Sequence, residues 1–105
     1  MKRARQIAQI KIAEREYQVR ATAHAIERME ERGIDEEIVA ADILALGKEK
    51  IKQMREVNDV AALIDEDNDV TLIVEFAENA LKVVTVIDKT NVWVKKGTKV
   101  ERLYK

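Results

Sequence analysis

The sequence contains no cysteine and no proline, and it has only three glycines. The absence of cysteine excludes a disulfide framework, a thiolate metal site and a thiol nucleophile. No stretch is rich in glycine, proline or serine, so no linker or internal domain boundary is indicated. The length of 105 residues is that of one ordinary domain. We therefore expect a single domain spanning residues 1–105.

Long hydrophobic runs are also absent. No apolar run approaches the roughly 20 residues that a membrane-spanning helix needs. The basic segment 1–9 is not followed by a continuous apolar stretch, which argues against a secretory signal. Hydrophobic residues make up 47% of the chain, too many for a disordered chain of near-zero net charge. The expectation is a folded, cytoplasmic domain with no membrane association.

Neither sign of charge dominates the whole chain, but the charges are segregated along it. The total is 19 basic and 20 acidic residues, for a net charge of -1. Residues 1–32 carry a net +3, residues 33–80 a net -9 and residues 81–105 a net +5. If the two basic ends meet in space, the domain has a positive face that attracts phosphate. The alternative is a solvated surface on which opposite charges merely complement one another.

The beginning of the chain predicts a β-hairpin. Apolar and polar residues alternate in segments 10–12 and 17–21, and the short polar segment 13–16 separates them. We expect an irregular or helical start before this hairpin.

Two helices are predicted next. Thr22 is suited to cap a helix that ends with Gly33 in the left-handed conformation. Asp35 is suited to cap a second helix, which ends at Gly47. The acidic residues that follow Asp35 support this helix start, because negative charge is stabilised at the positive N-terminal end of the helix dipole.

The second half of the chain is predicted to form strands separated by turns. Strand-like segments occur at residues 57–64, 70–77, 81–87 and 92–94, with a further short one at 100–104. The run 81–87 is nearly all apolar, which predicts a central strand covered on both faces. The expected fold class is α+β, with two N-terminal helices packed on an antiparallel β-meander of about four strands, preceded by a small hairpin.

The first predicted helix carries the residues best suited to binding and catalysis. His24, Arg28 and Arg32 follow one another at i, i+4 spacing and form one row along the helix. The planar fork of arginine fits phosphate oxygens, and histidine can move a proton near neutral pH. The row therefore predicts a site that binds a phosphodiester and supplies an acid or base for its cleavage.

The same residues also fit a purely structural interpretation. Arg28 can pair with Glu31, and Arg32 with Glu36, as surface ion pairs of small stabilising effect. The ring of His24 can pack against the sheet with a nitrogen bonded to a backbone carbonyl. Spacing alone does not decide between the two interpretations.

Neither a metal site nor a cofactor site is expected. One histidine and no cysteine leave only carboxylates as metal ligands. The acidic segment 65–69 lacks the glycine and the distal glutamate of an EF-hand loop, so it is predicted to be a solvated hairpin tip. The sequence also lacks a glycine-rich phosphate loop.

Residues 24–34 resemble the H-A-x-x-R-M-x-x-R-G-I signature of a small bacterial and phage family of unknown function. That family is grouped with the fold shared by barnase, EndoU, the tRNase colicins and the RelE and BrnT toxins. The resemblance implies a RelE/BrnT-like domain and a metal-independent ribonuclease of toxin type. It further implies roles for four residues: His24 as acid or base, Arg28 and Arg32 as phosphate ligands, and Thr85 as a sheet-side contact. The acidic middle of the chain departs from the strongly basic character of RelE-like toxins.

Three classes of function follow from these observations. The first is an RNA-binding domain with endoribonuclease activity, in which the 2′-hydroxyl of the RNA attacks the phosphate. The alternative is a non-enzymatic phage or bacterial interaction protein that binds a host protein or a small anionic ligand. The third is a structural or oligomerisation domain. RNA, and an antitoxin or host protein held by the acidic surface, are the partners that these hypotheses name.

Trp93 does not distinguish these classes. We expect its side chain in the core or in an interface in every case. Stacking on a nucleic-acid base is the alternative.

Overall fold

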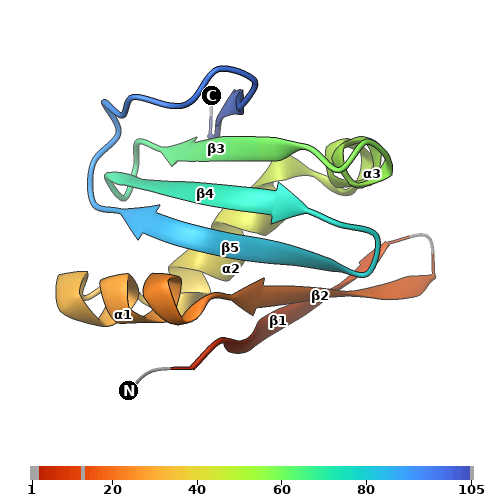
Figure 1. The fold of residues 1–105 in the computed structure, drawn as a ribbon, viewed down its shortest axis with the longest axis horizontal. Coiled ribbons are helices and arrows are strands. Elements are labelled where there is room, and N and C mark those ends of the chain that lie inside the picture. Colours follow the sequence, from red (N-terminus) through yellow and green to blue (C-terminus); the bar gives the residue numbers. More distant parts are fainter. Residues whose placement is uncertain (1–2, 13, 105) are drawn as a thin grey trace.

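The computed structural model describes residues 3–12 and 14–104, which are built around one six-stranded sheet (Figure 1). Along the chain the elements are β1 (Arg5–Ile12), β2 (Arg15–Ala21), α1 (Ala23–Arg32), α2 (Glu36–Leu46), α3 (Lys48–Glu56), β3 (Val60–Asp65), β4 (Val70–Phe76), β5 (Ala80–Ile87) and β6 (Lys99–Arg102). No helix of the described residues is long and apolar enough to cross a membrane.

The sheet is mixed, with the strand order β1-β2-β5-β4-β3-β6. β1 and β2 form an antiparallel hairpin, and β3, β4 and β5 form an antiparallel meander. β2 pairs with β5 in parallel, and β6 pairs with β3 in parallel. The three helices lie between β2 and β3 in sequence. The strand that pairs with β2 is β5, which comes after β3 and β4 in the chain.

This topology corrects the predicted architecture. The fold is α+β, but it has three helices and six strands in a mixed sheet, so the prediction of two helices on a four-stranded antiparallel meander was wrong. The hairpin, predicted as a small unit preceding the helices and meander, belongs to the same sheet because β2 pairs with β5. Hydrophobic periodicity indicates local secondary structure, but it does not indicate which distant strands pair. The β2–β5 pairing was missed because it joins residues 18–21 to residues 80–83.

Three further segments differ from the sequence-based description, which assigned no element to residues 48–56 and gave wrong predictions for residues 92–94 and for the start of the chain. Residues 48–56 form α3, although only Ile51 and Met54 of this highly charged helix are buried. Residues 92–94 were predicted as a strand but lie in the irregular segment 88–98, between β5 and β6. The start of the chain was predicted as irregular or helical, but it is extended from Arg5 onward. Part of the turn predicted at residues 13–16 lies outside the described residues.

The helix boundaries agree with the sequence signals. The hydroxyl of Thr22 accepts a hydrogen bond from the backbone N–H of Ala25, so Thr22 caps α1 as predicted. Gly33 ends this helix with φ = 64°, a left-handed conformation that costs glycine little. Asp35 occupies the N-cap position of α2 without a side-chain capping bond, and Gly47 follows the last residue of that helix.

The hydrophobic core lies between one face of the sheet and the helices. The strand residues facing it alternate with outward-facing ones. Side chains buried there from the helices are Ala25, Ile26, Met29, Val39, Ile43, Ile51 and Met54. In Figure 1, α2 passes behind β4 and β5. The opposite face of the sheet, which faces the viewer, has no helix over it.

Two carboxyl groups are buried on the helical side of the sheet. Asp42 of α2 and Asp65 at the end of β3 both have an exposed fraction of 0%. The phenol of Tyr104 donates to Asp42 Oδ1 at 3.0 Å, while Asn68 donates to both oxygens of Asp65. Burial, followed by the hydrogen bond with Asp65, raises the pKa of Asp42 to about 8. Near neutral pH Asp42 is therefore a carboxylic acid that donates to the Asp65 carboxylate, which gives its otherwise unpartnered Oδ2 a partner.

Candidate nucleic-acid interface

The predicted His/Arg row is positioned by the attachment of α1 to β5. The backbone N–H of Thr22 donates to the carbonyl of Val83 at 3.0 Å, and its hydroxyl donates to the carbonyl of Val84 at 2.7 Å. At the other end of α1, Arg32 pairs with Asp88 at 2.5 Å, one residue after β5 ends. The helix therefore runs beside the last part of β5, along the margin of the sheet.

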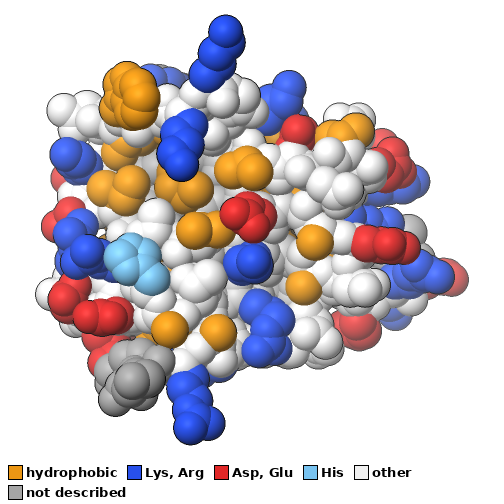
Figure 2. Space-filling model, viewed as in Figure 1, with side chains coloured by type: hydrophobic (Ala, Val, Ile, Leu, Met, Phe, Trp, Pro, Cys, Tyr) orange, Lys and Arg blue, Asp and Glu red, His pale blue; other side chains and the backbone are white. Residues whose placement is uncertain are grey.

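His24 is exposed at this margin. Figure 2 shows the histidine, the only one in the chain, at the edge of the uncovered sheet face. The interpretation that packs its ring against the sheet was wrong, because the residue is exposed. Its ring has no hydrogen bond or ion pair to any other described residue, so both nitrogens are open to a ligand.

Both arginines of the row are held by acids. Arg28 pairs with Glu31 at 2.9 Å, as the structural interpretation predicted. Arg32 pairs with Asp88 and not with Glu36, so that part of the prediction was wrong. Glu36 is instead paired with Arg5 of β1. A phosphate would have to displace a carboxylate from each guanidinium before either arginine could bind it fully.

Thr85 lies on the uncovered face of the sheet. It is the register partner of Ile73 in β4, and its side chain is half-buried. Its position separates it from the valines that enter the core on either side, Val83 and Val86. No hydrogen bond of the described residues joins Thr85 to His24, and Thr85 lies on β5, an interior strand of the sheet.

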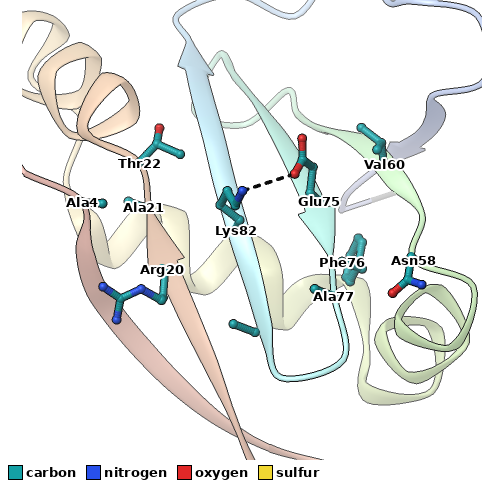
Figure 3. A pocket seen from close by; sticks show the side chains of 11 residues that line it. Ala4, Arg20, Ala21, Thr22, Asn58, Val60, Glu75, Phe76, Ala77 and Lys82 are labelled. Atoms are coloured by element: carbon teal, nitrogen blue, oxygen red, sulfur yellow. Dashed lines mark ion pairs between the residues drawn. The ribbon is translucent and has the colours of Figure 1, made fainter.

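Sequence reasoning missed a hollow on the uncovered face. It has a volume of about 520 Å³ and is bordered by β2, β4, β5 and the segment before β3. Figure 3 shows Arg20 and Lys82 on adjacent strands here, with Glu75 next to Lys82. The Lys82 Nζ lies 3.5 Å from Glu75 Oε1. Arg20 has no ion-pair partner among the described residues.

A second hollow of about 540 Å³ lies between the sheet and segment 93–98. Its floor is formed by apolar residues of the sheet, including Ile73 and Val84, and its rim carries Lys95 and Lys96. Val60 and Glu75 line both hollows, so the two adjoin. Together they make one track across the uncovered face, called here the sheet groove.

The sheet groove joins the two basic ends of the chain. Arg20 comes from the first basic segment, and Lys82, Lys95 and Lys96 come from the second. The one acid that lines either hollow is Glu75. The groove is therefore positive although the whole chain has a net charge of -1. Figure 2 shows hydrophobic side chains and scattered Lys and Arg side chains on the same face.

The sequence did contain a signal for this open face. Glu75 and Lys82 interrupt two otherwise apolar strands, β4 and β5. A charged residue inside an apolar strand marks a side that is not buried. The prediction that segment 81–87 is covered on both faces was wrong, because Lys82 is exposed. Trp93 was expected in the core or an interface; it is 89% exposed, so it does not lie in the core.

The described residues contain no cluster of three or more histidine or acidic side chains that could hold a metal ion. Comparison of the chain with protein-family models, curated protein sequences and solved structures finds no match.

Proposed function

We propose that the protein is an RNA-binding domain of toxin-like type that uses its uncovered sheet face, with His24 as the proton-transfer group of a metal-independent endoribonuclease. The observation that carries the proposal is the meeting of the two basic ends in the sheet groove, on the face whose edge carries an exposed and unpartnered histidine. A positive groove attracts a phosphodiester backbone. The histidine at the edge of the same face supplies the acid or base that cleavage needs.

The reaction uses groups of the RNA and of α1. His24 accepts the proton of a 2′-hydroxyl, whose oxygen attacks the adjacent phosphorus. The bond from phosphorus to the 5′-oxygen breaks, leaving a 2′,3′-cyclic phosphate, and the leaving oxygen takes a proton from water while His24 returns its own proton to the solvent. Arg28, one helical turn after His24, stabilises charge on the phosphorane once the phosphate has displaced Glu31. The resemblance of residues 24–34 to the toxin-associated signature supports the same assignment.

Thr85 and Arg32 have smaller parts in this proposal. Thr85 offers a hydroxyl to the RNA from the uncovered face of the sheet. Arg32, held by Asp88, adds positive charge at the end of α1. No metal ion enters the reaction as proposed.

The proposal is tested by incubating the protein with single-stranded RNA in EDTA. Cleavage with 2′,3′-cyclic phosphate ends is expected for the wild type. His24→Ala should lower the rate by about 10²-fold or more, the usual contribution of a general acid or base. Gln53→Ala, an exposed substitution on α3, serves as the control and should cleave like wild type. Equal rates for wild type and His24→Ala, or no cleavage of any RNA, would contradict the enzymatic part.

The second candidate is a non-enzymatic binder of a host protein or an antitoxin. The exposed side chain of Trp93 favours it, because an aromatic residue left in water is common at protein interfaces. Pull-down from bacterial lysate, with and without nuclease, separates the two candidates. Nuclease-resistant recovery of one defined protein, together with no RNA in the eluate, would favour the binder.

A further inference from the structure

We propose that Trp93 and the sheet groove form a binding slot for single-stranded RNA, in which an unpaired base stacks on the indole and the backbone crosses the cations of the groove. This inference rests on the proposed RNA-binding function and deepens it by naming the strandedness of the ligand and the residues that select it. His24 and its chemistry are not needed for the slot.

Trp93 is held in an outward position by the segment that carries it. Segment 88–98 is fixed near one end, where the Thr71 hydroxyl donates to the carbonyl of Lys89 at 2.8 Å. Near the other end, the N–H of Thr98 donates to the carbonyl of Lys95 at 3.1 Å across a turn that contains Gly97 with φ = 95°. Both residues that flank the tryptophan are half-buried. The indole is therefore presented to solvent by an anchored backbone.

An exposed indole in this position indicates a ligand. A buried tryptophan ordinarily removes a large apolar area from water, and this one is 89% exposed. Together with Val94, it borders the second hollow, whose floor is apolar. A planar ring beside an apolar hollow matches the stacking platforms that hold unpaired bases.

The charges next to the indole select a polyanion. Lys95 and Lys96 follow Trp93 closely in sequence and line the same hollow. The track continues to Lys82 and Arg20 in the adjoining hollow, with Glu75 between them and already paired with Lys82. Four cations and one acid thus line a path that begins at an aromatic ring. Lysine and arginine along a groove track a phosphate backbone.

The same charges disfavour a second copy of the chain as the occupant. A symmetric dimer through this face would place one positive groove against another. A duplex is disfavoured for a different reason, because its bases are stacked inside and offer no free face to Trp93. An unpaired strand can both stack a base on the indole ring and place its phosphates against the cations.

The chain contains its own reporter for this test. Trp93 is the only tryptophan, so tryptophan fluorescence reports on the slot alone. The probes are a ten-nucleotide oligouridylate, an RNA duplex of equal length and the matching single-stranded DNA. We expect the single-stranded RNA to quench the fluorescence, the duplex to leave it nearly unchanged, and the affinity to fall steeply with added salt.

Variants are compared by the fluorescence anisotropy of a labelled oligouridylate. Trp93→Ala should weaken binding on the order of tenfold, as expected for the loss of one stacked base. Trp93→Phe should restore part of the affinity, which a general loss of structure would not allow. Lys95→Gln with Lys96→Gln should weaken binding and lower its salt dependence. The matched control is Lys52→Gln, an exposed lysine of α3 outside both hollows.

Several outcomes would overturn the slot. These are equal affinity of Trp93→Ala and wild type, equal quenching by the duplex, and quenching by anionic phospholipid vesicles but not by RNA. A dimer in sedimentation that Trp93→Ala abolishes would also overturn it. Quenching by RNA without any cleavage would leave the slot standing and reject the nuclease. Cleavage that is unchanged in Trp93→Ala would leave the nuclease standing and reject the slot.

Discussion

Arg20 and Lys82 are register partners in the parallel pair of β2 and β5, and both lie on the uncovered face of the sheet. Like charges on neighbouring strands repel each other, so the pairing opposes folding. Lys82 is partly offset by Glu75 at 3.5 Å, whereas Arg20 has no described acidic partner. A fold that keeps this repulsion at the meeting point of its two basic ends fits an anion-binding surface.

Replacing Arg20 should therefore separate stability from binding. Arg20→Gln removes the repulsion and should leave the free energy of unfolding unchanged or raise it by up to about 1 kcal/mol. The same variant should weaken RNA binding and reduce the dependence of its logarithm on log salt by about one. Urea unfolding and salt-dependent RNA titrations check the two effects. A large loss of stability would mean that Arg20 has a structural role instead.

Removing the acid that holds Arg32 should strengthen RNA binding. Asp88→Asn frees the guanidinium from its 2.5 Å ion pair and removes one negative charge beside β5. The affinity should rise several-fold at low salt, and the gain should vanish at high salt as charges are screened. Glu101→Gln is the matched control, because its partner Lys50 lies on α3, away from the groove. An unchanged affinity would argue that RNA does not approach the end of α1.

The Thr22 hydroxyl makes one of the contacts that attach α1 to β5. Thr22→Val keeps the shape of the side chain but loses both the capping bond to Ala25 and the bond to the carbonyl of Val84. The free energy of unfolding should fall by about 1–3 kcal/mol, since a cap is lost and a half-buried carbonyl is left unpaired. Thr22→Ser should recover most of the loss. Urea denaturation of the three proteins measures these differences, and a Thr22→Val protein as stable as wild type would show that the hydroxyl does not stabilise the junction of α1 and β5.

The buried carboxyl pair predicts how stability depends on pH. The pKa of Asp42 is about 8 in the folded protein and near 3.8 in the unfolded chain, so between these values the folded state holds a proton that the unfolded state has released. The free energy of unfolding should therefore fall by a few kcal/mol as pH rises from about 4 to 8, and then level off. The pKa of Asp65 is lowered, so its own effect lies below this range.

Asp42→Asn should remove most of this slope. The amide can donate to Asp65 and accept from the Tyr104 phenol without a proton to lose. The variant should be more stable than wild type at pH 8 and close to it at pH 5, as measured by urea unfolding at each pH. A parallel offset at both values would show that Asp42 is not the titrating group.

The features that depend on residues close together in sequence could be predicted. The cap at Thr22, the left-handed Gly33 and the hairpin of β1 and β2 each follow from a local rule and were confirmed. The pairing of β2 with β5 could not be predicted, because it joins residues about 60 positions apart, and a pattern of apolar residues does not name its partner.

The candidate site was predictable in part for the same reason. The helical row placed His24 correctly on an exposed side of α1, but the acids that hold the arginines are partly distant in sequence, as Asp88 is. The sheet groove arises only when β2 and β5 meet, so no segment of the sequence contains it. The exposure of Trp93 was missed because an apolar triplet at residues 92–94 is typical of a strand.

The most direct test of the RNA-binding face is a titration of the ¹⁵N-labelled His24→Ala protein with single-stranded RNA, followed by amide chemical shifts. The account predicts that the shifts concentrate in residues of the uncovered face, such as Arg20, Lys82, Thr85 and Lys95, and that α3 and the outer side of α2 stay unchanged. Shifts confined to the helices, or none at RNA concentrations above that of the protein, would contradict it.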